Sequence, residues 1–140
     1  MLFKNILVPT DFTKKSEKAL DVAVRMASAD EGNITLLHVI ETIAEADEDE
    51  FKNFYKRLRG RAQKKMEEMI RPYTKSERAI RSEIAYGKRT AEIVEYASLN
   101  DVDLIVLSSH RIEKINPAEG WATISYRVAI LAHCPVMMVK

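Results

Sequence analysis

Short apolar segments alternate with segments of helical periodicity along this 140-residue chain, and that order constrains the fold more than any other feature. Two apolar segments, residues 3–8 and 103–107, alternate too little between polar and apolar side chains for strands with one wet face. They are therefore predicted to be strands covered on both faces, as at the centre of a parallel sheet. The other predicted strands are residues 33–39, 79–86 and 135–139, the second of them near an edge.

Four predicted helices separate these strands. Apolar residues recur at helical spacing over residues 13–29 and 52–71, after the N-cap candidate Thr90, and from Ile124 onward. Strands and helices in alternation, joined by right-handed crossovers, give an α/β fold with a doubly wound five-stranded parallel sheet. With the first strand at the centre, the strand order is 3-2-1-4-5. The turns after strands one and four then face each other across a cleft, where such sheets bind their ligands.

The turn after the first strand carries the first candidate site residues. Pro9 has no N–H, so it is predicted to end the hydrogen-bonded ladder and to place Thr10 and Asp11 at the carboxyl edge of the sheet. A hydroxyl and a carboxylate at that edge are suited to contact a ligand. The alternative is that Thr10, Asp11 or Thr13 only caps the following helix, by accepting backbone hydrogen bonds. The sequence leaves both interpretations open.

The charge balance bears on the class of partner. The chain has 22 basic and 21 acidic side chains and a net charge of +1, which argues against a general nucleic-acid or membrane-surface binder. No apolar stretch approaches the ~20 residues that span a bilayer. The first strand begins too early to leave room for a signal peptide. We therefore expect a cytoplasmic protein with one domain over residues 1–140.

Two isolated side chains are expected to be structural. Cys134 is the only cysteine, so an intrachain disulfide is excluded, and we expect a packed residue before the last strand. His38 lies within an apolar run, where a histidine is more often a packed, hydrogen-bonded neutral ring than a ligand. No metal site is predicted.

Five segments of the chain, in the right order and at the right spacing, resemble the universal stress protein family, whose members are small α/β domains of the adenine-nucleotide alpha hydrolase-like type. The matching segments are residues 4–13 (KNILVPTDFT), 36–39 (LLHV), 87–93 (GKRTAEI), 103–110 (DLIVLSSH) and 134–139 (CPVMMV). The resemblance covers nearly the whole chain. It implies an adenine-nucleotide site in the cleft that the sheet order predicts.

Nucleotide-binding members of that family carry a signature of Gly-x-x-Gly, about nine residues, then Gly with Ser or Thr, whose glycines let backbone N–H groups approach the phosphates. This chain departs from the signature. Ser108, Arg111 and Ala122 stand where glycines are expected, and Gly120 is out of register. Thr123 keeps the hydroxyl. Arg111 either contacts a phosphate through its guanidinium or fills the phosphate space itself.

The resemblance therefore implies ATP or a related adenine nucleotide, with Mg²⁺ if it binds, at a degenerate site that holds it weakly or not at all. The candidate binding residues are Pro9, Thr10, Asp11, Val39, Leu107, Ser108, Arg111, Ala122, Thr123 and Ile124. A homodimer is implied as well. It would form through the last strand, from Pro135 to Val139, because that apolar strand is an uncovered sheet edge.

The favoured function is a dimeric stress-response protein that is not an enzyme, with slow ATP hydrolysis left open and His110 as its candidate base. The alternative is a nucleotide-free interaction module of the same fold. Two other proteins of this topology are disfavoured. A phospho-receiver domain would carry an aspartate after the third strand, where this chain has Tyr86 and Gly87. A flavodoxin would have aromatic loops that stack on the flavin, and these are not evident.

Overall fold

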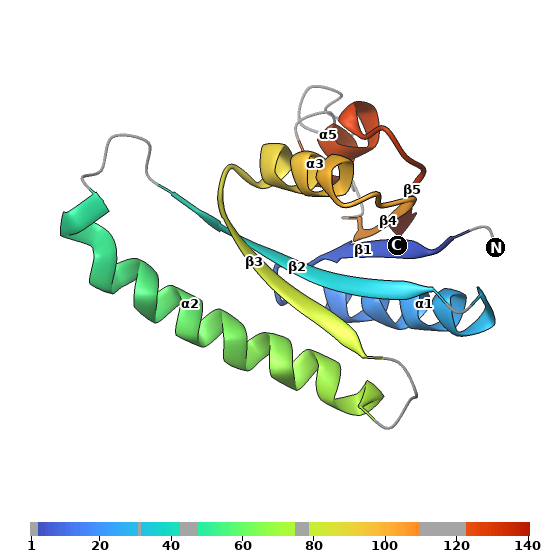
Figure 1. Cartoon of the computed structure of the whole chain (residues 1–140), viewed down its shortest axis with the longest axis horizontal. Coiled ribbons are helices and arrows are strands. Elements are labelled where there is room, and N and C mark those ends of the chain that lie inside the picture. The colour runs from blue at the N-terminus through green and yellow to red at the C-terminus, as the bar shows by residue number, and fades with distance from the viewer. Residues whose placement is uncertain (1–2, 31, 43–47, 75–78, 110–122) are drawn as a thin grey trace.

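The computed structural model describes residues 3–30, 32–42, 48–74, 79–109 and 123–140 (Figure 1). The predicted strands and helices are all present, with bounds shifted by a few residues. In chain order the elements are β1 (Asn5–Pro9), α1 (Lys14–Asp30), β2 (Asn33–Glu41), α2 (Glu48–Ile70), the 3₁₀ turn η1 (Arg71–Tyr73), β3 (Ile80–Gly87), α3 (Arg89–Leu99), β4 (Leu104–Ser108), α5 (Ile124–Leu131) and β5 (Val136–Val139). In the ranges described, no helix is both long and apolar enough to cross a membrane.

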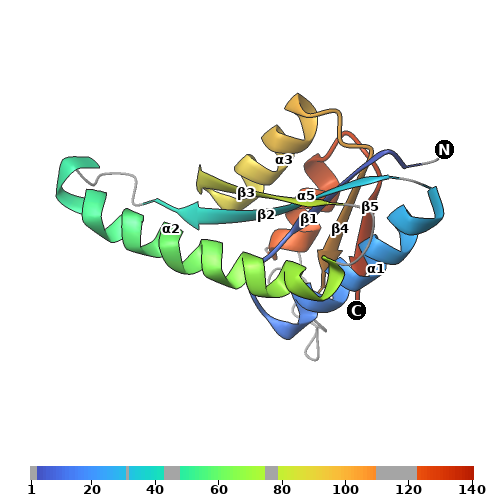
Figure 2. The same ribbon diagram turned by 60° about the horizontal axis from the view of Figure 1, so that its bottom comes forward.

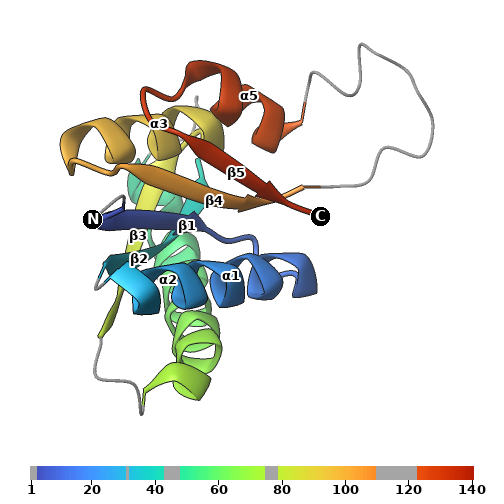
Figure 3. The same cartoon turned by 90° about the vertical axis from the view of Figure 1, so that its right-hand side faces the viewer.

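The five strands form one parallel sheet in the order β3-β2-β1-β4-β5, as predicted. The connections change direction between β1 and β4, so the carboxyl ends of these two strands flank the switch point. Helices α1 and α2 cover one face of the sheet, and α3 and α5 cover the other (Figures 2 and 3).

The central strand, β1, contributes side chains to two hydrophobic cores, one on each face of the sheet. Neighbouring side chains of a strand point to opposite faces. Ile6 and Val8 therefore pack in the core beneath α1 and α2, whereas Leu7 packs in the core beneath α3 and α5. All three side chains are at most 1% exposed. This double burial explains why the predicted central strands show no alternation of polar and apolar residues. The edge strand β3, in contrast, has no fully buried residue, as predicted.

Pro9 is the last residue of β1, as predicted, and Thr10 and Asp11 follow it at the carboxyl edge of the sheet. Pro9 pairs with Leu37, and one further hydrogen bond joins the strands beyond it, from the Thr10 N–H to the Leu37 carbonyl at 2.8 Å. N–H groups point alternately to the two sides of a strand, so the missing donor of Pro9 faces β4. The pairing of β1 with β4 covers only Ile6 and Leu7. Proline is therefore tolerated at this position.

The turn between β3 and α3 differs from the prediction. Thr90 is not the N-cap, because α3 begins at Arg89 and the residue before it, Lys88, is extended without a side-chain cap bond. The hydroxyl of Thr90 is buried and has no hydrogen-bond partner among the described residues. Gly87 has a φ of 145°, which a residue with a side chain adopts only under strain. This glycine directs the chain from the sheet edge into α3.

Candidate functional site

Thr10, the residue after β1, is the centre of the turn that leads into α1. Its side chain is 7% exposed. Its hydroxyl accepts a hydrogen bond from the Phe12 N–H at 3.0 Å and donates one to Ser16 Oγ at 3.0 Å. Its carbonyl oxygen accepts a hydrogen bond from His38 Nδ1 at 2.9 Å. These bonds hold the turn against both α1 and β2, and they keep Phe12 at a φ of 66°.

The structure decides which residue caps α1. Thr13 is the residue immediately before α1, and its Oγ1 accepts a hydrogen bond from the Ser16 N–H at 3.3 Å. Thr13 is therefore the N-cap of α1. Asp11 Oδ1 instead accepts the N–H and the hydroxyl of Thr13, at 3.1 and 2.6 Å. Burial raises the pKa of Asp11, whereas its hydrogen bonds lower that pKa by a larger total amount. The net pKa of Asp11 therefore lies below its usual value. Asp11 is therefore an exposed, charged group at the edge of the sheet.

His38 is a packed, hydrogen-bonded ring, as predicted. Its ring is half-buried and stacks near the Phe12 ring, with 4.2 Å between centroids. A carbonyl oxygen can only accept, so the bond to Thr10 requires a proton on Nδ1. Burial lowers the pKa of His38, the Thr10 bond raises it, and the nearby charges of Arg89 and Lys65 lower it again. The net pKa lies below its usual value, so the ring is neutral at neutral pH.

The stability of the protein should fall in acid in a way that depends on His38. The pKa of His38 is below 6.5 in the folded chain, so the unfolded chain takes up the proton first. The stabilisation is therefore complete above about pH 6.5 and is lost as the pH falls through the folded-state pKa. We expect the free energy of unfolding, from urea titrations at about pH 8 and about pH 5, to fall more in the wild type than in His38→Gln. An equal fall in both proteins would contradict this expectation.

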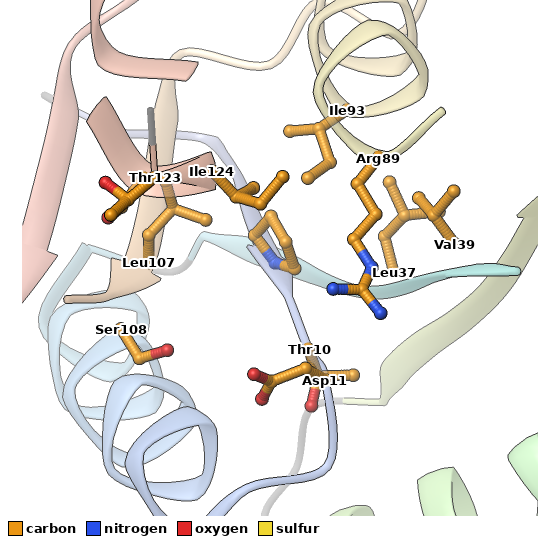
Figure 4. Close-up of a pocket in the computed structure, with 12 residues that line it drawn as sticks. Thr10, Asp11, Leu37, Val39, Arg89, Ile93, Leu107, Ser108, Thr123 and Ile124 are labelled. Atoms are coloured by element: carbon orange, nitrogen blue, oxygen red, sulfur yellow. The ribbon is translucent and has the colours of Figure 1, made fainter. Parts of the chain in front are cut away.

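A pocket of about 300 Å³ opens at the carboxyl ends of β1 and β4 (Figure 4). Eight of the ten predicted binding residues line it, namely Pro9, Thr10, Asp11, Val39, Leu107, Ser108, Thr123 and Ile124. The other two, Arg111 and Ala122, lie outside the described residues, as does His110. The structure therefore brings together the ends of strands one and four as the sheet order predicted.

The pocket has an apolar side and a polar side. Figure 4 shows Ile93, Leu107 and Ile124 on one side and the oxygen atoms of Asp11 and Ser108 on the other. Small-molecule sites commonly combine apolar walls of this kind with a few polar groups that set the ligand's orientation. The arrangement suits a ligand with a flat apolar ring at one end and hydroxyl or anionic groups at the other.

The sequence profile of the universal stress protein family matches residues 2–140. The chain belongs to this family. It is 27% identical to universal stress protein YxiE of Bacillus subtilis, over 99% of this chain and 100% of that protein. Its structure is similar to universal stress protein UspA from Lactobacillus plantarum, with a TM-score of 0.81 and 25% identity over 100% of this chain and 99% of that one.

A third similar protein is the universal stress protein from Archaeoglobus fulgidus, solved in complex with dAMP. It has a TM-score of 0.63 and 16% identity, and the match covers 100% of both chains. At that identity the likeness shows the fold alone. The fold of this universal stress protein is thus the adenine-nucleotide alpha hydrolase-like fold, as the resemblance implied.

Four residues of the pocket in this universal stress protein were not predicted: Leu37, Arg89, Ile93 and Ser125. Arg89 has the greatest consequence, since it is the one cation among the described lining residues. It was missed because it follows β3, an edge strand that does not touch β1. A signal was available, however. The helix that joins β3 to β4 must cross over the strands between them, so the start of α3 reaches the cleft.

The guanidinium of Arg89 points from the start of α3 toward Thr10 and Asp11 (Figure 4). Its Nε lies 3.6 Å from Glu41 Oε1, and the two side chains are 45% and 57% exposed. An exposed ion pair of this kind contributes little to stability. Arg89 can therefore exchange Glu41 for an anionic ligand group at little cost.

Cys134 is half-buried against the core beneath α3 and α5. Burial raises the pKa of its thiol, and the charge of Asp103 raises it further. The thiol is therefore protonated at neutral pH, which disfavours a redox role. In the part of the chain that the structure describes, no three His, Cys, Asp or Glu side chains are grouped to hold a metal ion.

Proposed function

We propose that this universal stress protein binds an adenine nucleotide, weakly, in the pocket between the ends of β1 and β4. The observation that carries the proposal is the pocket itself, an apolar slot with hydroxyl and charged groups opposite, at the switch point of the sheet. The relative solved in complex with dAMP supports the choice of an adenine nucleotide. ATP with Mg²⁺ is the ligand to test first.

The chemistry of the lining residues orients the ligand. The adenine ring fits between the apolar side chains of Val39, Ile93 and Ile124. The charged carboxylate of Asp11 repels phosphate but accepts hydrogen bonds from ribose hydroxyls or from the adenine amino group. The phosphates then lie toward Ser108 and Thr123, whose hydroxyls donate and beside which α5 begins. At a glycine the backbone N–H groups approach the phosphates closely, whereas here side-chain hydroxyls take their place. We therefore expect the binding to be weak.

A side chain that fills the apolar part of the pocket should weaken this binding. We expect Ile124→Trp to weaken the binding of ATP with Mg²⁺ by about ten-fold or more, measured by isothermal titration calorimetry, since the indole occupies the space of the adenine. Leu99→Trp is the matched control. It adds the same side chain at a position that is 73% exposed and does not line this pocket. Wild-type affinity is expected there.

Two outcomes would count against the nucleotide site. One is equal ATP affinity in Ile124→Trp and the wild type. The other is no detectable binding of ATP, ADP or AMP to the wild type, which would favour the nucleotide-free interaction module. That second candidate rests on a specific observation, namely that Ser108 stands at the end of β4 where the signature has its first glycine.

We infer that bound nucleotide is not turned over quickly. Hydrolysis needs a base that takes a proton from water. Among the described residues that line the pocket, Asp11 is the one carboxylate, and its lowered pKa makes it a poor base at neutral pH. Slow hydrolysis is compatible with this arrangement.

We also propose that the protein is cytoplasmic and forms a homodimer through β5. That strand is at one edge of the sheet, and Met137 on it is 37% exposed. Such an edge favours antiparallel pairing with a second copy about a two-fold axis.

The dimer should dissociate when the β5 edge becomes charged. We expect Met137→Glu to be monomeric by light scattering at about micromolar concentration, because two carboxylates would meet at the paired edge. Ser82→Glu, which adds the same charge to the exposed part of the opposite edge strand, should stay dimeric. A monomeric wild type, or a dimeric Met137→Glu, would rule out this interface.

A further inference from the structure

A second pocket of about 270 Å³ lies beside the first, between the end of β2 and the middle of α2. The two pockets share Val39 and Arg89 in their walls. Consecutive residues of the β1–α1 turn divide between them, since Asp11 lines the first pocket and Phe12 lines the second. Figure 2 shows α2 running along one face of the sheet, and residues of this helix form one wall of the second pocket. The proposed nucleotide site leaves the second pocket unused.

The second pocket carries an excess of positive charge. Arg61, Lys65 and Arg89 line it, against the single carboxylate of Glu41. Glu41 is paired with Arg89. Arg61 and Lys65 have no ion-pair partner in the described parts of the chain. They are four residues apart on α2, so two like charges share one helix face, which disfavours the helix itself. An anion in the pocket would relieve that repulsion.

Phe12 and His38 form the floor of the pocket. Phe12 has a φ of 66°, a conformation that is strained for a residue with a bulky side chain. Its ring lies against the His38 ring, and Lys65 Nζ is 5.3 Å from the Phe12 ring centroid. This contact holds the ammonium group over the floor, on the pocket side of α2. The strained turn therefore orients one of the cations.

His38 adds a group of a different kind. Its Nδ1 is bonded to the Thr10 carbonyl, so in the neutral ring Nε2 is a hydrogen-bond acceptor. This acceptor can take a hydrogen bond from a hydroxyl of a ligand, which the cations cannot do because they only donate. A phosphate ester that carries a neighbouring hydroxyl, or a singly protonated phosphate, supplies both an anionic oxygen and an O–H.

We propose that this second pocket binds a phosphate group, held by Arg61, Lys65 and Arg89. Two arginine forks and an ammonium group match the several oxygens of phosphate better than the two of a carboxylate. The phosphate has two possible sources. It belongs either to a separate phosphate ion or ester, as the proposed orientation of the nucleotide requires, or to a nucleotide in the first pocket whose phosphates pass Arg89 instead of lying toward Ser108 and Thr123.

The test measures phosphate binding without a nucleotide, so it does not depend on the proposed function. Inorganic phosphate is titrated into the full chain at constant ionic strength and followed by ¹H–¹⁵N correlation spectra. We expect saturable shifts at the amides of Phe12 and Val39. In Arg61→Gln/Lys65→Gln the affinity should fall by about ten-fold or more. In Arg57→Gln/Lys64→Gln, exposed residues of α2 outside the pocket, it should stay within about two-fold.

The outcomes separate the possibilities. No saturable shift in the wild type, or an equal loss in both double variants, would overturn the proposal, since the second result means unspecific charge attraction. If the pocket variant also weakens ATP binding but not adenosine binding, the phosphate belongs to the nucleotide. If phosphate still binds when ATP is saturating, the pocket takes a separate phosphate ion or ester.

Discussion

Replacing Arg111 by glycine is expected to tighten the binding of ATP with Mg²⁺ by about ten-fold or more. Arg111 stands where the family signature has a glycine, and we expect a side chain there to keep the phosphates away from backbone N–H donors. Each charge-assisted hydrogen bond contributes roughly 1.5–3 kcal/mol, and about 1.4 kcal/mol corresponds to ten-fold in affinity. Arg111 itself lies outside the described residues.

Calorimetric titration of the wild type, Arg111→Gly and Arg111→Lys tests this expectation. The lysine variant keeps a long charged side chain, so its affinity should stay near that of the wild type. Loss of binding in Arg111→Gly would make Arg111 a phosphate ligand and reverse the prediction. Undetectable binding in all three proteins would favour the nucleotide-free interaction module.

Leu7→Ala should lower the free energy of unfolding by about 3–5 kcal/mol. Leu7 is 0% exposed, in the middle of the central strand, and packs in the core beneath α3 and α5. The cavity left by the lost atoms cannot close easily, because β2 and β4 hold β1 on both sides. Since small proteins are stable by only about 5–15 kcal/mol, this is a large share of the total.

The measurement is urea denaturation of Leu7→Ala beside Leu99→Ala. Leu99 is 73% exposed, so the same substitution there should change stability by no more than about 0.5 kcal/mol. A loss below about 1 kcal/mol for Leu7→Ala would mean that the core around β1 relaxes freely. That result would contradict the close packing seen around the central strand.

Much of the site's framework was predictable from the sequence, because burial and strand order are indicated by local patterns of apolar residues. The apolar runs around Leu7 and Ile105 show no alternation, and both residues are fully buried in the structure. The alternation of strands and helices then restricts the sheet order, since crossovers are right-handed. From that order it follows that Thr10 and Ser108 line one cleft, as the pocket shows.

The choice between capping and ligand binding at the first turn was not predictable. Asp11 and Thr13 both favour helix starts, and the sequence alone does not separate them. The structure separates them by hydrogen bonds. Thr13 Oγ1 accepts the Ser16 N–H, whereas Asp11 Oδ1 accepts the N–H and the hydroxyl of Thr13, and the Asp11 side chain is exposed.

By itself the sequence determined which segments are strands and helices, the order of the strands, and the two turns that meet at the switch point. Those features depend on the period and continuity of apolar residues along the chain. Only the tertiary structure showed that Arg89 lines both pockets and that Arg61 and Lys65 line the second pocket together with Phe12 and His38. The reason is physical. Where a crossover helix passes over the sheet depends on the packing of whole elements, which no local pattern of residues records.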